Sequence, residues 1–353
     1  MAPPATQMEN SSFLIIKPSS FGDVIHALPV ARAIKLAHPN ARVDWVVADS
    51  LAGLVALSPH VDSVIPFKRA KWTKWWRPGI LAEITGQIAS IRTRKYDVVI
   101  DLQGLLRSGL MTFVCQGNIK AGFANAREGA WLFYGARVTA PKEAVHAIDR
   151  YMSLLPAVGV ANGAGVEYDL AEDDSAAAWA DQYLPKTPFA VVNPNARWAT
   201  KQWPLERYGQ LCHELVKDFG HQIVIVGGPG EEPNGAKLAA LAGVGALDLT
   251  GKTNPAQLAA LFRRAKVLFT NDSGPLHLAV AVGLPTVSLF GPTDPARTGP
   301  YGQGHLALRS GRACSPCFLR ACPYHHECMT DLEAPKVAQA WRRAISPDGA
   351  SNG

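Results

Sequence analysis

Short apolar runs alternate with helical patterns along most of the chain, and this alternation limits the fold more than any other feature. Runs at 13–17, 43–47 and 96–101 have the length and the β-branched content of buried strands. The rhythm restarts with runs at 188–195, 221–228, 265–272 and 285–291. Helical patterns lie at 23–37, 79–93, 204–219, 234–242, 255–264, 275–282 and 333–345. Repeated strand–helix units predict an α/β fold with parallel sheets that carry helices on both faces.

One segment breaks this rhythm and indicates a domain boundary. Residues 159–179, GVANGAGVEYDLAEDDSAAAW, are rich in Gly, Ala and acidic residues, as a linker is. We therefore predict two Rossmann-like domains, an N-terminal one over 12–175 and a C-terminal one over 176–346. Ligands of open α/β sheets bind beyond the carboxyl ends of the strands. Two facing sheets would create a cleft between the domains.

Composition excludes several classes of protein. Of 353 residues, 48% are hydrophobic and 18% charged, which is typical of a globular chain. No run approaches the roughly 18 apolar residues of a membrane span, and the first 12 residues lack the basic start and apolar core of a signal peptide. We expect a cytoplasmic protein. The net charge of +6 is modest, and no recognised nucleic-acid module is present, so we expect no nucleic-acid partner.

The turn after the first predicted strand raises the first question of chemistry. In KPSSFGDVIHALP, Gly22 and Asp23 stand where a helix begins. Asp23 could cap that helix, and the helix N–H groups would then lower its pKa. It could instead face the predicted cleft and take a proton from a substrate. The residues alone leave both interpretations open.

A second turn, in LFTNDSGPLHLA, has the features of a phosphate site. A strand ends at Asp272 and Ser273, and a helix follows at once, so unpaired N–H groups and a positive dipole end would meet there. Gly274 leaves room for a phosphate, and His277 lies one turn on. A further turn at 290–295 would reach the same edge of the sheet. Together the two turns favour a nucleotide diphosphate site, although Asp272 and Ser273 could simply cap the helix.

Two other loops could complete such a site. Lys201, in NPNARWATKQWP, could neutralise a diphosphate leaving group, or it could be an ordinary solvated lysine. The glycine-rich stretch 226–233 has the wrong spacing for a dinucleotide fingerprint, so hydride chemistry has little support. Glu231 or Glu232 in that stretch could border a ribose, or the stretch could be a surface turn.

Four cysteines gather near the C-terminus in the pattern C-x2-C-x4-C-x5-C. Thiolates at this spacing could hold a structural zinc, but the second half lacks the usual C-x2-C pair. Free thiols are the alternative, and no catalytic metal is expected. The cysteines are Cys314, Cys317, Cys322 and Cys328.

Several of these segments, in this order and spacing, resemble glycosyltransferase family 9, the heptosyltransferases of lipopolysaccharide inner-core synthesis, and the type I enzymes most. The segments are KPSSFGDVIHALP, YDVVIDLQGLLRSGL, NAREGAWLFY, KQWP and NDSGPLHLA. The resemblance implies the GT-B architecture, ADP-L-glycero-D-manno-heptose as donor, inversion at the anomeric carbon and no cofactor. It makes Asp23 the catalytic base and Lys201 a ligand of the donor diphosphate. The other donor-binding residues that we expect are Asn195, Glu232, Thr253, Asp272, Ser273, Gly274 and His277.

The resemblance also implies an acceptor, the Kdo of a lipid A precursor, reached at the cytoplasmic face of the inner membrane by a peripheral enzyme. The stretch KRAKWTKWWR (68–77) holds five basic residues and three tryptophans. It would engage Kdo and phosphates, with Trp72, Trp75 and Trp76 near the membrane interface. A solvated loop is the alternative. The expected acceptor-binding residues are Ser20, Lys68, Arg69, Lys71, Lys74, Arg77, Arg107 and Arg127.

Three other functions stay open. TNDSGPLHLA and the C-terminal cysteines resemble type II enzymes, which would add heptose to an acceptor that already carries heptose. A hydrolysing sugar-nucleotide epimerase also uses two facing Rossmann-like domains, but the basic tryptophan loop would then have no role. A sugar-nucleotide binding protein without catalysis is the third, and the presence of both Asp23 and Lys201 argues against it.

Overall fold

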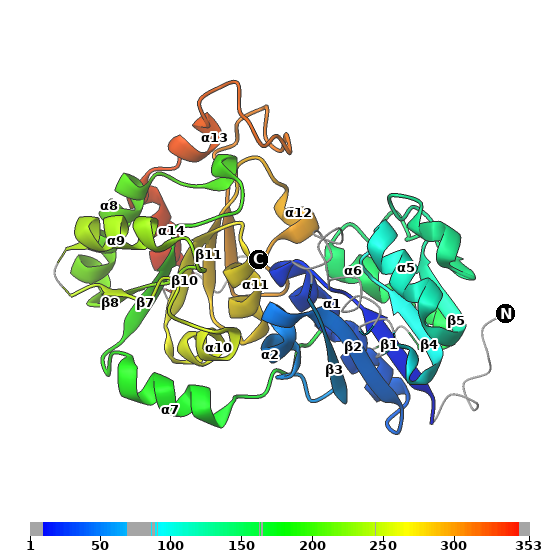
Figure 1. Cartoon of the computed structure of the whole chain (residues 1–353). Coiled ribbons are helices and arrows are strands. Elements are labelled where there is room, and N and C mark those ends of the chain that lie inside the picture. Colours follow the sequence, from blue (N-terminus) through cyan, green and yellow to red (C-terminus); the bar gives the residue numbers. More distant parts are fainter. Residues whose placement is uncertain are drawn as a thin grey trace, which may run out of the picture. The chain divides into compact units, whose positions relative to one another are not determined.

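The chain forms two compact units, one ending at residue 171 and the other beginning at residue 172 (Figure 1). The structure is a computed structural model, and it describes residues 10–68, 86, 89, 91–161, 163, 165–243 and 245–345. Each unit contains one six-stranded sheet in which every pairing is parallel. The α/β fold with parallel sheets that the sequence predicts is confirmed.

The first unit has the strand order β3-β2-β1-β4-β5-β6. Its strands are β1 (Ser12–Ile16), β2 (Arg42–Ala48), β3 (Ser63–Phe67), β4 (Lys95–Asp101), β5 (Gln116–Phe123) and β6 (Ala136–Val138). Its helices are α1 (Phe21–Ala37), α2 (Ala52–Val55), α5 (Leu106–Val114) and α6 (Ala147–Met152), with 3-10 turns η2 (Asp49–Leu51), η3 (Ala130–Phe133) and η4 (Leu155–Val158). The order reverses between β1 and β4, and open sheets bind ligands at such a switch point.

The second unit has the equivalent order β12-β11-β10-β7-β8-β9. Its strands are β7 (Phe189–Asn193), β8 (Gln222–Ile225), β9 (Leu247–Asp248), β10 (Val267–Asn271), β11 (Thr286–Leu289) and β12 (His305–Leu308). Its helices are α7 (Asp174–Tyr183), α8 (Leu205–Phe219), α9 (Glu232–Ala242), α10 (Pro255–Arg264), α11 (Gly274–Ala281), α12 (Pro295–Thr298), α13 (Glu327–Thr330) and α14 (Ala334–Ile345), with the 3-10 turn η5 (Ala199–Lys201). The order reverses here between β10 and β7.

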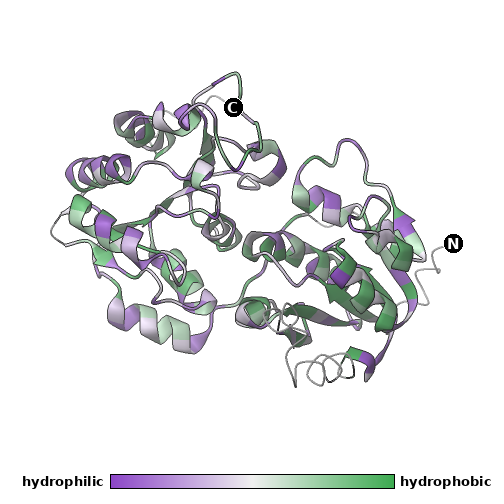
Figure 2. Ribbon diagram, turned by 45° about the horizontal axis from the view of Figure 1, so that its top comes forward, coloured by the Kyte–Doolittle hydropathy of each residue, from purple (hydrophilic) through white to green (hydrophobic). Residues whose placement is uncertain are grey.

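The central strands form the core of each unit because helices cover both of their faces. In β1, Phe13 to Ile16 are completely buried, as are Val267 and Leu268 of β10. A buried cluster of the second unit includes Trp203 and Tyr208, whose ring centres lie 4.8 Å apart. The outer helices show purple and green residues along one ribbon, as amphipathic helices do (Figure 2).

Several elements differ from the sequence prediction. Apart from the helix at 79–93, the predicted strands and helices correspond to observed ones, whereas β3, β5, β6, β9 and β12 are not predicted. Strand β5 reads QGNIKAGF, and its glycines and polar residues hide the apolar pattern of a strand. Helix α7 begins at Asp174, inside the segment predicted to be a linker, and the helical pattern at 79–93 lies mostly outside the described residues. Within the described ranges, no helix combines the length and the apolar character needed to cross a bilayer.

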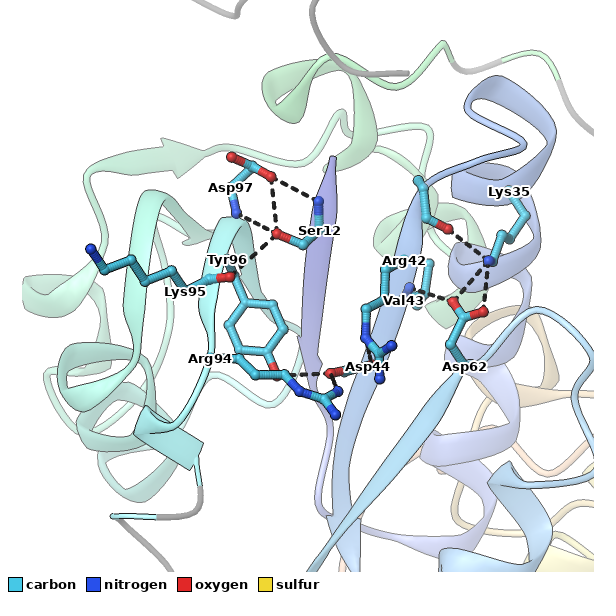
Figure 3. Close-up of polar contacts among 11 residues, drawn as sticks. Ser12, Lys35, Arg42, Val43, Asp44, Asp62, Arg94, Lys95, Tyr96 and Asp97 are labelled. Carbon is cyan, nitrogen blue, oxygen red and sulfur yellow. Dashed lines mark hydrogen bonds and ion pairs between the residues drawn. The ribbon is translucent and has the colours of Figure 1, made fainter. Parts of the chain in front are cut away.

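Charged side chains hold together the amino end of the first sheet (Figure 3). The carboxylate of Asp44 in β2 is completely buried and pairs with Arg94 at 2.7 Å and Arg42 at 3.0 Å. It also accepts a hydrogen bond of 2.9 Å from the hydroxyl of Tyr96 in β4. Burial, followed by the Asp44 charge, raises the pKa of Tyr96 well above its usual value. The start of β4 is thereby tied to β2 across the central strand.

We expect Asp44→Ala to reduce the free energy of unfolding by about 2 kcal/mol, because the Tyr96 hydroxyl loses a buried hydrogen bond. The two arginines add little to this loss, since their side chains are 45% and 49% exposed and can turn to water. Equilibrium urea unfolding measures the change. Glu167→Ala is the control, because it removes an exposed pair with Arg32 and should cost less than about 1 kcal/mol. Equal losses in both variants would contradict this account.

Candidate active site

Asp23 lies at the start of α1, at the carboxyl end of β1. Its Oδ2 atom accepts hydrogen bonds from the backbone N–H of Ser20 at 3.1 Å and from the Ser20 hydroxyl at 2.6 Å. Ser20 is the N-cap and Asp23 the third helical residue, so the pair forms a capping box. Both bonds use Oδ2, and Oδ1 receives no hydrogen bond from the residues that the structure describes. The side chain is partly exposed. Capping and proton transfer are therefore compatible, because each role uses a different oxygen.

A buried lysine accompanies this carboxylate. Lys17 follows β1 directly and is only 3% exposed. Its Nζ donates to the carbonyl oxygen of Leu102 at 3.1 Å and lies 5.0 Å from the centre of the Tyr151 ring. Burial alone would lower the pKa of this ammonium, but Tyr151, Asp23 and Asp101 outweigh burial and raise it. Lys17 is therefore a fixed positive charge beneath the start of α1.

This charge sets the ionisation of Asp23. Burial by itself raises the pKa of the Asp23 carboxyl, but the Lys17 ammonium and the two Ser20 bonds outweigh it. The net result is a pKa below the usual value for aspartate. Asp23 is consequently an anion at neutral pH, in the protonation state that a general base requires.

The other expected acceptor residues within the described ranges lie at the same edge of the sheet. Lys68 follows β3 and is exposed, Arg107 lies at the start of α5, and Arg127 follows β5 and is exposed. The backbone N–H of Arg127 donates to the carbonyl of Gly104 at 2.9 Å, which joins the loops after β4 and β5. The remaining expected residues lie outside the described residues: Arg69, Lys71, Trp72, Lys74, Trp75, Trp76 and Arg77.

One buried acid at this edge was not predicted as a site residue. Asp101 ends β4 and accepts hydrogen bonds from the backbone N–H groups of Gln103 at 2.8 Å and Gly104 at 3.0 Å. The Tyr134 hydroxyl donates to its other oxygen at 2.6 Å. Burial raises the pKa of Asp101. Its contacts shape the loop that leads to Arg107, which the sequence pattern could not reveal.

In the second unit, the turn between β10 and α11 is organised by side chains that do not cap the helix. Asp272 accepts at Oδ2 from the Lys201 ammonium at 2.6 Å and from the Thr293 hydroxyl at 2.6 Å. The Ser273 hydroxyl lies 3.0 Å from Asn193 Nδ2 and makes no side-chain cap to α11. The alternative that Asp272 and Ser273 only cap this helix is therefore wrong. Gly274, the first helical residue, presents a helix start that suits an anion.

Lys201 is held in place, unlike a solvated surface lysine. Its side chain is 17% exposed, and its Nζ lies 4.8 Å from the centre of the Trp198 ring in addition to its pair with Asp272. The guanidinium of Arg320 lies 5.0 Å from the centre of the same ring. Two cations thus share one indole beside the β10–α11 turn. Thr293, Asn193, Trp198 and Arg320 were not among the expected site residues.

The remaining expected donor residues lie at helix starts or on loops at the same edge. His277 is buried one turn into α11, and Asn195 follows β7 and is also buried. Asn195 accepts a hydrogen bond from Asn234 at 2.8 Å. Glu232 is the first residue of α9, and Thr253 lies in the loop after β9. Gly251 in that loop has φ of +73°, and a Cβ there would lie 2.4 Å from Glu232 Oε1, so a side chain would displace Glu232.

The four C-terminal cysteines line one cavity of about 50 Å³, together with His326. All four are free thiols; Cys314 is exposed and Cys328 is buried. Within the described part of the chain, no group of three or more His, Cys, Asp or Glu side chains is placed to hold a metal ion. A structural zinc at these cysteines stays a hypothesis.

We expect Lys17→Met to raise the pKa of Asp23 above its wild-type value, because burial then acts with less opposition. NMR titration of the Asp23 carboxyl measures the shift. A carboxyl whose pKa is lowered on folding stabilises the fold above its unfolded pKa of about 4, and this contribution is lost as the pH falls through the lowered value. The variant should lose it at a higher pH than the wild type.

Lys35→Met is the matched control for this titration. Lys35 pairs with Asp62 at 2.8 Å in the same unit. Its removal should raise the pKa of Asp62 and leave that of Asp23 unchanged. An unchanged Asp23 pKa in Lys17→Met would mean that the Ser20 bonds alone keep the carboxyl ionised.

Comparison with known proteins adds independent information on the family. The family model described as glycosyltransferase family 9 (heptosyltransferase) matches residues 86–327. Lipopolysaccharide heptosyltransferase 1 of Pseudomonas aeruginosa is 32% identical over 322 residues, which cover 88% of this chain and 87% of the relative. A solved structure of E. coli heptosyltransferase WaaC with ADP is 29% identical with a TM-score of 0.80, covering 95% of this chain and 100% of the other. A second, with ADP-2-deoxy-2-fluoro heptose, is 28% identical with a TM-score of 0.76, covering 94% and 99%.

These similarities extend over both units, and they agree with the parallel sheets and with the polar residues at their carboxyl ends. The GT-B fold and the family that the sequence motifs indicate are confirmed. The chain belongs to glycosyltransferase family 9, the heptosyltransferases, and is a glycosyltransferase.

Proposed function

We propose that this chain moves heptose from ADP-L-glycero-D-manno-heptose to the Kdo of a lipid A precursor, with inversion, in lipopolysaccharide inner-core synthesis. The observation that carries the proposal is the state of Asp23. Its carboxylate is ionised by the buried Lys17 charge, partly exposed, and bonded within the described residues through one oxygen only. The relatives named lipopolysaccharide heptosyltransferase 1 support the choice of reaction.

The donor would bind to the second unit. Its diphosphate would lie at the start of α11, where Ser273, Gly274 and His277 surround the first turn. Lys201 has three ammonium hydrogens, and its bond to Asp272 uses one, so two can reach phosphate oxygens. Asn195, Glu232 and Thr253 would border the adenosine. The solved WaaC structures with ADP and with an ADP-heptose analogue support a nucleotide-heptose donor.

The reaction would be a single displacement. The acceptor hydroxyl oxygen attacks the anomeric carbon while its proton passes to Asp23 Oδ1, and the bond from that carbon to the phosphate oxygen breaks. ADP leaves with the bonding electron pair, and Lys201 and the α11 start stabilise its growing charge. Such transition states resemble an oxocarbenium ion, in which the bond to the leaving group is largely broken. The base therefore has to be ionised and correctly positioned, and a high pKa matters less.

The acceptor would bind to the first unit. Ser20, Lys68, Arg107 and Arg127 lie at the carboxyl edge that carries Asp23. The three basic side chains would bind the carboxylate of Kdo and the lipid A phosphates, and the Ser20 hydroxyl would add a hydrogen bond. The enzyme would work as a peripheral protein at the cytoplasmic face of the inner membrane, where this acceptor is embedded.

We expect Asp23→Asn to reduce turnover at least about a hundredfold, because an amide keeps an oxygen for the Ser20 bonds but cannot take a proton. The affinity for ADP should not change. The measurement is ADP release from ADP-heptose, with and without Kdo2-lipid A. Asp173→Asn is the control, since Asp173 is a carboxylate at a helix start outside the site. It is the N-cap of α7, accepts from the backbone N–H of Ala176 at 2.8 Å, and should leave turnover unchanged when replaced. Wild-type turnover in Asp23→Asn would exclude Asp23 as the base.

Lys201→Met should weaken ADP binding about tenfold to a hundredfold, the value of a charge-assisted hydrogen bond to phosphate. Isothermal titration with ADP measures it. Lys237→Met is the control, because Lys237 lies in the same unit, is 56% exposed and pairs with Glu206. If both variants bind ADP as the wild type does, the diphosphate lies elsewhere.

The choice of acceptor has a direct test. ADP release that depends on Kdo2-lipid A supports the proposal. Release that occurs only with an acceptor already carrying heptose would contradict it and identify a type II reaction. Tight ADP-heptose binding without release for either acceptor would favour a binding protein that lacks catalysis.

A further inference from the structure

Helix α5 and the turn η3 carry large apolar side chains on the solvent side of the first unit. Leu106, Leu110 and Phe113 are exposed at positions i, i+4 and i+7 of α5, so they lie on one side of the helix. Trp131 and Leu132 are exposed on η3. The solvent side of a surface helix normally carries polar residues. We call these five side chains the α5–η3 surface.

The two elements form one continuous surface because they pack tightly against each other. A Cβ on Gly109 of α5 would lie 2.7 Å from the Phe133 ring and 3.0 Å from Ala130 Cα of η3. The rings of Phe113 and Phe133 are 5.7 Å apart. Figure 1 shows α5 beside β4 and β5, so the sheet supports this surface from behind.

Positive charges border the apolar side chains. Lys120 Nζ lies 5.8 Å from the centre of the Phe113 ring and donates to the Phe113 carbonyl at 2.8 Å. The guanidinium of Arg137 lies 4.9 Å from the centre of the Trp131 ring. Between residues 106 and 137 the chain has four basic residues and one acidic residue, Glu128. The surface is therefore apolar at its centre, and cations outnumber acids at its border, where Glu128 accepts from the backbone N–H of Leu106 at 3.1 Å.

This combination fits one kind of partner. Tryptophan, phenylalanine and leucine side chains enter the interface of a bilayer, while neighbouring lysine and arginine side chains meet anionic headgroups. A second copy fits poorly, because a twofold contact would bring the same cations close to one another. We propose that the α5–η3 surface docks the enzyme on an anionic lipid bilayer. The proposal deepens the proposed function and rests on it for the membrane-embedded acceptor.

Co-sedimentation with vesicles tests the surface without donor or acceptor. The vesicles are phosphatidylcholine mixed with phosphatidylglycerol, compared with phosphatidylcholine alone. The variant is Phe113→Ser with Leu132→Ser, because these are the most exposed side chains of the surface, at 62% and 61%. The control is Leu36→Ser with Val216→Ser, which removes apolar side chains of 53% and 49% exposure elsewhere.

We expect the wild type and the control to bind the mixed vesicles, and the Phe113/Leu132 variant to bind at least about tenfold more weakly. Lys120→Gln with Arg137→Gln should remove the preference for phosphatidylglycerol. Equal binding by the Phe113/Leu132 variant and the control overturns the proposal. A second result would also overturn it: a dimer in sedimentation velocity that forms in the wild type and the control but not in the Phe113/Leu132 variant. The surface would then join two copies.

Enzyme assays separate failure of this proposal from failure of the proposed function. The Phe113/Leu132 variant should transfer heptose normally to a soluble Kdo acceptor without acyl chains, and should show a raised KM for Kdo2-lipid A in vesicles. A wild type that binds mixed vesicles through this surface but transfers no heptose would refute the function and keep the surface. Normal transfer with an unchanged vesicle KM in the variant would refute the surface and keep the function.

Discussion

Parallel strand pairing is the constraint on which the rest of the molecule depends. Each parallel connection must return the chain to the same end of the sheet, so every strand of a unit ends at one edge. The register then decides which residues meet there. Ile16 pairs with Asp101, which puts Lys17 beside Leu102, and Thr270 pairs with Asn193, which puts Ser273 within reach of the Asn193 amide. The backbone hydrogen bonds of the sheet thus bring residues far apart in the sequence close enough for their side chains to interact.

Each edge carries a lysine that interacts with an aspartate, Lys17 with Asp23 through charge alone and Lys201 with Asp272 in a direct ion pair. The burial of the lysine separates the roles of the two. Lys17 is 3% exposed and bonded to a carbonyl, so it cannot meet a substrate and acts on Asp23 through its charge. Lys201 is 17% exposed, so its ammonium can reach a ligand while Asp272 and Thr293 hold the turn. In the first unit the lysine keeps the aspartate ionised. In the second unit the aspartate holds the lysine in position.

The sequence predicts the fold class, the family and most of the helices, because strong apolar periodicity and capping residues are local signals. The boundaries of α10 agree with the predicted range, since Asn254 and Pro255 mark its start. Strand β5 escapes prediction because its glycines face Tyr134 and Val99, and their lack of a side chain reflects close packing that no local pattern encodes. The linker prediction at 159–179 overlaps α7 because alanine-rich segments suit helices as well as linkers.

The sequence likewise predicts part of the candidate site and misses the rest. The strand ends that carry Asp23, Lys201 and Asp272 could be found from the sequence, because they follow apolar runs. The charge that ionises Asp23 could not, since it depends on how deeply Lys17 and Tyr151 are buried in the folded chain. Thr293 lies in the turn at 290–295, which the sequence predicts to reach this edge. Its hydrogen bond to Asp272 depends on side-chain geometry and could not be predicted.

The Trp198 ring contacts both the Lys201 ammonium and the Arg320 guanidinium, and this affects the entropy that ligand binding costs. Long cationic side chains lose much rotational freedom when they hold a ligand. Here the indole and Asp272 already restrict the Lys201 side chain in the ligand-free protein. Part of the rotational entropy of Lys201 is therefore lost when the protein folds and not when a ligand binds. An anion that binds here mainly exchanges its hydration water for charges that are already in position.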